Sequence, residues 1–185
     1  KTPADAVRHG IGYLSEDRKR YGLMLIKSVA ENTALASLDR YIKYGFISDR
    51  KMKNEARDMN AKLRTKTPSM DQLLKNLSGG NQQKVIIARW LIKNSDILIF
   101  DEPTRGIDVG AKSEIYALMS ELAAQGKSII MISSELVEIL RMSDRVLVMC
   151  EGRKTGELDI SEANQENIMQ LSTMREEVSY GKEIS

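Results

Sequence analysis

The spacing of apolar residues changes near the middle of the chain. Between residues 50 and 63, apolar residues recur at the intervals of a helix, on a segment that is otherwise charged or polar. These residues are Met52, Ala56, Met59 and Leu63. After Lys93, short continuous apolar runs alternate with helical segments. The first part of the chain therefore predicts helices with a buried stripe, and the second part predicts alternating strands and helices.

The predicted strands and helices indicate one fold class. Strands are predicted at 11–14, 97–100, 128–132 and 145–150. Helices are predicted at 29–38, 50–63, 81–93, 111–124 and 135–142, with a short closing helix in the tail that starts at residue 161. Strands separated by helices of this length favour an α/β fold, with a mostly parallel sheet flanked by helices and a helical subdomain. In such sheets, ligands bind at the carboxyl ends of the strands.

Composition narrows the class of protein. The chain has 185 residues, of which 42% are hydrophobic and 29% are charged, which is enough for one sizeable core. Its net charge of +2 is too balanced to make nucleic acid the main partner. The single cysteine excludes an internal disulfide and suits a reducing compartment. No apolar run approaches the roughly 20 residues of a membrane-spanning helix, and the N-terminus has no secretory pattern. We therefore expect a cytoplasmic location and no nucleic-acid partner.

The segment NLSGGNQQKVII, residues 76–87, places a serine and two glycines directly before a helical apolar run. Ser78 at this position can cap the helix, and the glycines let the chain turn freely. The same position gathers unpaired backbone N–H groups at the positive end of the helix dipole, which favours a phosphate or another anion. The residues alone leave both interpretations open.

The apolar run 97–100 ends at two acidic residues, Asp101 and Glu102. At the carboxyl end of a parallel strand, Asp101 could hold Mg²⁺, which prefers one or two carboxylates and keeps several waters. Glu102 could orient or deprotonate an attacking water. The alternative is a solvated acidic strand end that the following proline terminates.

In their order and spacing, these segments resemble ABC-type ATPases over residues 11–158. Residues 77–82 resemble the signature motif, residues 97–104 resemble the Walker B motif, and residues 106–108 resemble the D-loop. Residues 11–16 resemble the segment that carries the Q-loop, and residues 29–32 resemble the short helix that follows the Q-loop. The phrases SEDRK, LSGGNQQK and DEPTRGIDVGAK further resemble the second ATPase module of duplicated ABC ATPases that energise bacterial uptake of ribose, galactose and similar monosaccharides.

The resemblance implies a role for each matching residue. In this family, the signature residues face the γ-phosphate of an ATP that the partner ATPase module holds, in a head-to-tail sandwich. It implies ATP and Mg²⁺ as cofactors, metal binding at Asp101 and Glu16, and catalysis by Glu102. The residues expected to contact nucleotide are Ser78, Gly79, Gly80, Asn81, Gln82 and Asp108.

The sequence departs from the family pattern at three positions. Glu16 replaces the Q-loop glutamine and adds negative charge near the metal. Asn81 stands where the family usually has glutamine. Ser134 occupies the switch position, where the family usually has a histidine, and the only histidine, His9, lies near the N-terminus. We therefore expect the ATP site built on Asp101 and Glu102 to hydrolyse slowly.

The phosphate-binding loop GxxxxGK[ST] is not found in the sequence. Residues 126–128, Gly-Lys-Ser, match the end of this motif, but Glu121 stands where its first glycine is required. A helix is also predicted before this tripeptide and a strand after it, which reverses the strand-to-helix order of a P-loop. We expect the chain to be a fragment that is inactive on its own. Its expected organisation is a partial ABC ATPase domain, 1–185, with a helical subdomain at 18–93, a Walker B core at 94–160 and a tail at 161–185.

The basic run of Arg18, Lys19 and Arg20 has two interpretations. It could meet acidic groups of a membrane subunit, or it could be a solvated loop. Trp90, on the apolar side of the signature helix, favours packing over adenine stacking.

Three function classes use ATPases of this kind: transporter modules, tandem ABC proteins that act on ribosomes, and nucleotide-gated clamps of DNA repair. The clamps need long coiled-coil heptads between Q-loop and signature, and the intervening segment is too short. Ribosome factors typically carry basic arms, and no strong basic excess is present, although this alternative stays open. The favoured function is ATP-driven monosaccharide import. Its expected partners are a second ABC module, transmembrane permease subunits and, indirectly, a periplasmic or extracellular sugar-binding protein, with the ATPase on the cytoplasmic side of the plasma membrane.

Overall fold

The computed structural model describes residues 2–174, which form two compact units. The first unit extends to Ser134 and the second begins at Glu135. The expected organisation into a helical subdomain at 18–93, a Walker B core at 94–160 and a tail at 161–185 stays a prediction.

The first unit contains the predicted parallel sheet. Its strands are β1 (Ile11–Leu14), β4 (Ile97–Asp101) and β5 (Ser128–Ile132), in the order β1-β4-β5. Both pairings are parallel, with Ile11 opposite Ile97 and Ile97 opposite Ser128. The middle strand has neighbours on both sides, and its Leu98 and Phe100 side chains are fully buried. Because parallel strands end at the same edge, Asp101 at the end of β4 and the following Glu102 lie beside the ends of β1 and β5.

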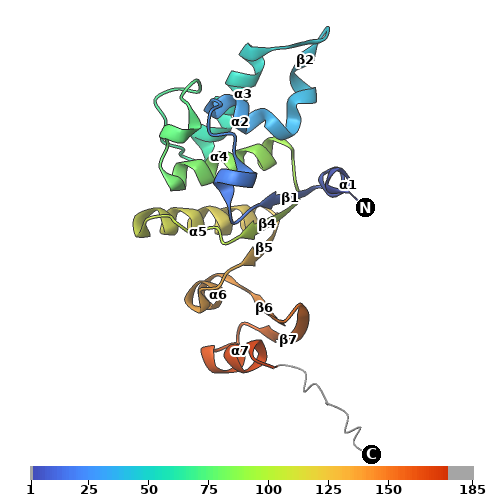
Figure 1. Cartoon of the computed structure of the whole chain (residues 1–185), viewed down its shortest axis with the longest axis vertical. Coiled ribbons are helices and arrows are strands. Elements are labelled where there is room, and N and C mark those ends of the chain that lie inside the picture. The colour runs from blue at the N-terminus through green and yellow to red at the C-terminus, as the bar shows by residue number, and fades with distance from the viewer. Residues whose placement is uncertain (1, 175–185) are drawn as a thin grey trace, which may run out of the picture. The chain divides into compact units, whose positions relative to one another are not determined.

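Helix α4 (Gly79–Ile92) lies at the centre of the first unit. It contacts α2 (Val29–Ala34), α3 (Asp49–Lys62), α5 (Val109–Ala124) and strand β1, and Figure 1 shows it between α5 and the group formed by α2 and α3. Ten of its residues are buried, including four long polar side chains, Gln82, Gln83, Lys84 and Arg89. A helix covered on this many sides needs hydrogen-bond partners for those groups.

Arg89 obtains its partners from the segment before and within α2. Its Nε donates to the Asn32 carbonyl at 2.8 Å, and its Nη1 donates to the Gly22 carbonyl at 2.7 Å. The Asn32 amide in turn bonds both backbone groups of Met24. Burial lowers the pKa of Arg89 to about 10, so the guanidinium is charged at neutral pH. These bonds fix the loop that leads into α2 on the central helix.

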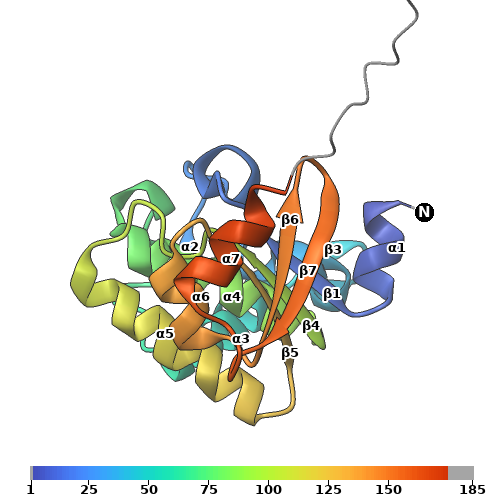
Figure 2. The same ribbon diagram turned by 90° about the horizontal axis from the view of Figure 1, so that it is seen from below.

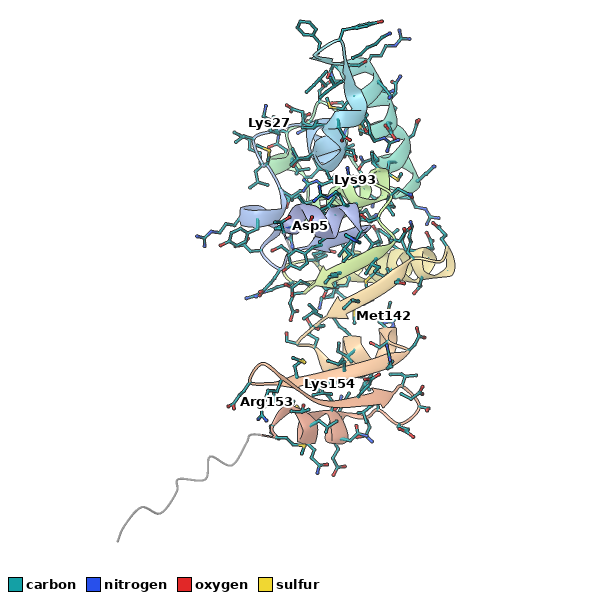
Figure 3. All side chains as sticks on the ribbon, turned by 90° about the vertical axis from the view of Figure 1, so that its right-hand side faces the viewer. Asp5, Lys27, Lys93, Met142, Arg153 and Lys154 are labelled. Atoms are coloured by element: carbon teal, nitrogen blue, oxygen red, sulfur yellow. The ribbon has the colours of Figure 1, made fainter. Side chains whose placement is uncertain are left out.

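Several local elements differ from the sequence prediction. The helix predicted at 29–38 is α2 followed by a 3₁₀ turn, Leu35–Tyr41, which a non-helical Ser37 interrupts. The sequence did not predict α1 (Pro3–Arg8), the π-helical turn η1 (Arg18–Gly22), the 3₁₀ turn η3 (Leu74–Asn76) or the small hairpin of β2 (Ile42–Lys43) and β3 (Phe46–Ile47). The hairpin turns at Tyr44 and Gly45, both with positive φ, as tight hairpin turns require. Lys27, labelled in Figure 3, lies before α2, and its ammonium group donates to the Glu31 carboxylate in that helix at 3.0 Å.

The second unit is a β-hairpin covered by helices. It comprises α6 (Leu136–Met142), β6 (Arg145–Cys150), β7 (Arg153–Asp159) and α7 (Gln165–Ser172). The strand at 145–150 forms as predicted, but its pairing among the described residues is antiparallel, with β7, and the sequence did not predict β7. Figure 2 shows α7 beside the two strands, and the predicted closing helix is thereby confirmed. The last predicted tail residues, 175–185, lie outside the described residues.

A glycine in β7 sets how closely this helix approaches the hairpin. A Cβ at Gly156 would lie 2.5 Å from a methyl carbon of Leu171. Leu171 packs with Val146, Val148 and Ile168 in the small core of the second unit.

Among residues 2–174, no helix is long and apolar enough to cross a membrane.

Candidate functional site

Ser78 occupies the N-cap position of α4 without capping the helix. The helix begins at Gly79, two residues before the predicted start, and Ser78 has extended backbone angles but makes no side-chain cap hydrogen bond. Its hydroxyl oxygen instead accepts a hydrogen bond from the Asn81 side-chain amide at 2.8 Å. The hydroxyl can therefore donate outward, and the interpretation of Ser78 as an ordinary helix cap is wrong.

Asn81 holds Ser78 in this orientation. Its amide nitrogen donates to Ser78, and its amide oxygen accepts from the backbone N–H of Lys66 at 2.8 Å. The pair of bonds fixes both ends of the amide group, so that its nitrogen faces Ser78. The shorter amide at this position thus has a defined structural role beside the signature serine.

A surface pocket of about 330 Å³ lies where α4 and α5 begin. Its lining residues are Lys66, Ser78, Gly80, Asn81, Asp108, Gly110, Ala111 and Glu114. A Cβ at Gly80 would lie 2.9 Å from the Cβ of Ala111, so only glycine lets the two helices approach this closely. The first N–H groups of a helix have no intrahelical partner, and two helix starts therefore direct their positive ends toward this pocket.

The carboxylates of the pocket have partners of their own. Asp108 caps α5 by accepting from the Ala111 N–H at 2.9 Å. Glu114 pairs with the buried Lys84 ammonium at 2.8 Å, and Lys84 also donates to the Arg64 carbonyl at 3.2 Å. The hydrogen bond from Lys84 holds the pKa of Glu114 below its usual value. With both acids engaged, the free donors at the pocket suit a phosphate group.

Two of the predicted nucleotide-contacting residues lie behind the pocket and do not line it. Gln82 is 4% exposed, and its amide nitrogen donates to the carbonyls of Leu74 and Leu77. It therefore holds the chain that leads to Ser78. Gly79 packs against the loop after β4, where a Cβ would lie 3.1 Å from the Gly106 carbonyl oxygen. Direct contact of these two residues with nucleotide stays a prediction.

Glu102 and Ser134, which the sequence predicts to act together, are in direct contact. The Ser134 backbone N–H donates to Glu102 Oε1 at 2.7 Å. The Glu102 N–H donates to the Ile132 carbonyl, so its backbone is anchored to β5. Glu102 has a φ of 45°, a left-handed conformation that is uncommon for a residue other than glycine and that recurs at functional sites.

Asp101 is bound by a residue that sequence reasoning missed. The Tyr13 hydroxyl, from the neighbouring strand β1, donates to Asp101 Oδ2 at 2.6 Å, and this bond raises the pKa of Tyr13. The only signal for it in the sequence is the strand pattern, which does not give the register between β1 and β4. Trp90 also contacts this strand, because its Nε1 donates to the Tyr13 carbonyl at 3.0 Å. Trp90 thus packs on β1, as the sequence predicted.

Metal binding by Asp101 and Glu16 stays a prediction. The Glu16 carboxylate forms an ion pair with Arg105. Within the part of the chain that the structure describes, no group of three or more His, Cys, Asp or Glu residues could hold a metal. Mg²⁺ commonly takes only one or two carboxylates beside substrate phosphates and waters, so Asp101 alone fits this ion. Metal binding by Glu16 would require its exposed ion pair with Arg105 to open.

The chemistry of the first unit is therefore divided between two places. The pocket at the start of α4 offers donors to an anion, and the carboxyl end of β4 offers Asp101 and Glu102. Neither acid lines the pocket. A parallel sheet with acids at the end of its middle strand, combined with a glycine-led helix start that offers donors, agrees with the resemblance to ATPase cassettes of the ABC type.

The comparison with known proteins gives the same class. The ABC transporter family model matches residues 2–105, more than half of the chain, and the chain belongs to this family. It is 60% identical over 95% of its length to a putative ribose/galactose/methyl galactoside import ATP-binding protein of Burkholderia ambifaria, of which it covers 34%. A protein of the same description from Halalkalibacterium halodurans is 57% identical over 94% of this chain, which covers 33% of that protein. The chain thus spans about a third of the length of these relatives.

Solved structures agree on the fold. A nucleotide-free ATP-binding cassette from an ABC transporter superposes with a TM-score of 0.72 over 92% of this chain and 68% of the other, at 23% sequence identity. At this identity the likeness is evidence for the fold, and it confirms the predicted α/β cassette.

The ion pair between Lys84 and Glu114 provides a test of how the pocket is held together. In Glu114→Gln, a buried ammonium loses its carboxylate partner, and we expect the free energy of unfolding to fall by about 1–2 kcal/mol at neutral pH, a value limited by the exposure of Glu114. Because the pKa of Glu114 is lowered in the folded state, this contribution is present above the ordinary carboxyl pKa and is lost as the pH falls through the lowered value. Urea unfolding at several pH values measures both effects.

The control is Glu121→Gln, on the exposed face of the same helix. It should change the free energy of unfolding by less than about 0.5 kcal/mol. Equal stability losses in the two variants would show that the buried pair does not stabilise the junction of α4 and α5.

Proposed function

We propose that this chain is part of an ATP-hydrolysing subunit that energises monosaccharide import through an ABC transporter, and that it supplies signature residues to the ATP of a partner ATPase module. The observation that carries the proposal is the start of α4. Ser78 stands at the N-cap position without capping the helix, and its hydroxyl faces a pocket with unpaired donors. A helix cap alone does not account for this arrangement.

The names of the relatives supply the transport part of the proposal. Both relatives described above are named putative ribose/galactose/methyl galactoside import ATP-binding proteins. This favours the importer over the ribosome-acting alternative. The remaining partners follow from the same function: a second ABC module, transmembrane permease subunits and, indirectly, an external sugar-binding protein. The subunit then works at the cytoplasmic side of the plasma membrane.

The residues of this chain take separate roles in the proposal. Ser78 donates its hydroxyl to a terminal phosphate, and the backbone N–H groups at Gly79 and Gly80 add to the positive potential there. At the second site, Asp101 holds Mg²⁺, which supplies charge neutralisation to the phosphates when it is bound. Glu102, aligned by the Ser134 N–H, accepts a proton from water. Ser134 replaces an imidazole in this site, and a hydroxyl cannot carry the positive charge that stabilises a departing phosphate.

Ser78→Asp separates the phosphate-binding role from the role of a helix cap. Aspartate is a favourable residue at a helix start, so the free energy of unfolding should stay equal or rise. Its carboxylate would face the incoming phosphate, and we expect ATP hydrolysis by the assembled transporter to fall at least about tenfold, ~1.4 kcal/mol in the barrier. Steady-state ATPase assays and thermal unfolding measure the two outcomes.

Ser69→Asp, at an exposed loop residue, is the matched control and should leave hydrolysis unchanged. Wild-type hydrolysis in Ser78→Asp would reject the proposed role of the pocket. The glycine variant Gly79→Asp is less informative, because its side chain would also meet Arg18.

Glu102→Gln tests whether the two ATP sites of the transporter are unequal. The glutamine keeps an oxygen for the Ser134 N–H, so the fold of this site should be retained. We expect total hydrolysis to fall less than about threefold, because the site without a switch histidine turns over slowly. The matching glutamate change in the partner module should reduce hydrolysis more than about a hundredfold. Near-complete loss in Glu102→Gln would contradict the asymmetry.

A further inference from the structure

Arg18 is a charged residue that the first unit buries almost completely. It begins the π-helical turn η1, and it is 8% exposed, whereas its neighbours Lys19 and Arg20 are exposed. Burial lowers the pKa of Arg18, although the residue stays cationic. A buried guanidinium needs hydrogen-bond acceptors, so its partners show which segments it holds together. The solvated-loop interpretation of the basic run is therefore wrong for Arg18.

The acceptors are two consecutive carbonyl groups in the loop after β4. Arg18 Nη1 donates to the Arg105 carbonyl at 2.8 Å, and Nη2 donates to the Gly106 carbonyl at 3.2 Å. A planar guanidinium presents parallel donors that suit neighbouring acceptors in this way, and a lysine ammonium does not. The ion pair of Glu16 with Arg105 joins the same two loops. The loop after β1 and the loop after β4 are thus bound at adjacent points.

The same guanidinium also occupies the space beside the first residue of α4. A Cβ at Gly79 would lie 2.6 Å from Arg18 Nη2. Gly79 directly follows Ser78, so the position of this guanidinium limits where the start of the helix can lie. Three segments far apart in the sequence, 15–22, 105–106 and 78–79, therefore meet at one side chain.

We propose that Arg18 is a positioning residue that fixes the start of α4 against the loop after β4, so that Ser78 faces the partner module's nucleotide. The proposal rests on the function proposed above and deepens it. Arg18 itself does not line the pocket.

Arg18→Met in the full protein, assembled with its transporter partners, tests the proposal. The methionine keeps the buried hydrophobic volume and removes the donors. We expect kcat for ATP hydrolysis to fall about tenfold, while KM for ATP changes less than about twofold, because Ser78 acts on closing and the partner module binds the nucleotide first. Arg18→Lys keeps one donor group and should recover part of kcat. Lys19→Met, at the exposed next position, is the matched control and should behave as wild type.

A double-mutant cycle with Gly79→Ala distinguishes positioning from general stabilisation. With Arg18 present, the new methyl group displaces the guanidinium and lowers kcat. With Met at residue 18, the same substitution should lower kcat less, because only the contact with the Gly106 carbonyl oxygen remains, so the two effects should be non-additive. Additive effects, or wild-type kcat in Arg18→Met, would overturn the proposal. If Arg18→Met does not fold, as thermal unfolding would reveal, the cycle with Arg18→Lys gives the same decision.

The result for Ser78→Asp distinguishes a failure of the proposed function from a failure of the proposed role of Arg18. Wild-type hydrolysis in that variant would reject the role of the pocket, and with it the reason for positioning Ser78. Loss of hydrolysis in Ser78→Asp, combined with additive effects of Arg18→Met and Gly79→Ala, would reject only the role of Arg18.

Discussion

The close approach of two helix starts at Gly80 is the constraint on which the first unit depends. With no side chain at this residue, the first turns of α4 and α5 meet at the methyl group of Ala111. The pocket, the alignment of Ser78 and Asn81, and the ion pair between Lys84 and Glu114 all lie along this contact. A β-carbon at residue 80 would separate the helices and alter each of these interactions, so one glycine determines the shape of the donor site.

The central helix can be buried on most sides because its charged residues bind carbonyl oxygens of other segments. Arg89 binds the segment 22–32, and Lys84 binds the loop at Arg64. These bonds compensate for lost hydration, and they also fix the direction in which each loop leaves the core. The helix therefore positions two separate segments through its polar residues, while its apolar residues supply the packing.

Much of the fold could be predicted from apolar patterning, because a strand such as β4 is buried by its own composition wherever its neighbours lie. The pairing of β6 with β7 could not be predicted, since β7 is a polar strand, RKTGELD, whose stability comes from its partner and from α7. The site divides in the same way. Ser78 and the strand-end acids follow recognisable patterns along the chain, whereas Tyr13 and Arg18 act across strands and loops. The role of Tyr13 depends on the register between two strands, and the role of Arg18 depends on the positions of backbone carbonyl groups. Neither can be predicted from the identities of the side chains.

The left-handed backbone of Glu102 has a consequence for any attempt to make the protein more robust. Glycine or asparagine would adopt this conformation with less strain, and substitution here would relieve about 1 kcal/mol. The same change would remove the carboxylate that the Ser134 amide aligns. A search for thermostable variants would therefore favour replacement of Glu102. The selected variants would have a higher free energy of unfolding but would lack the carboxylate proposed for catalysis.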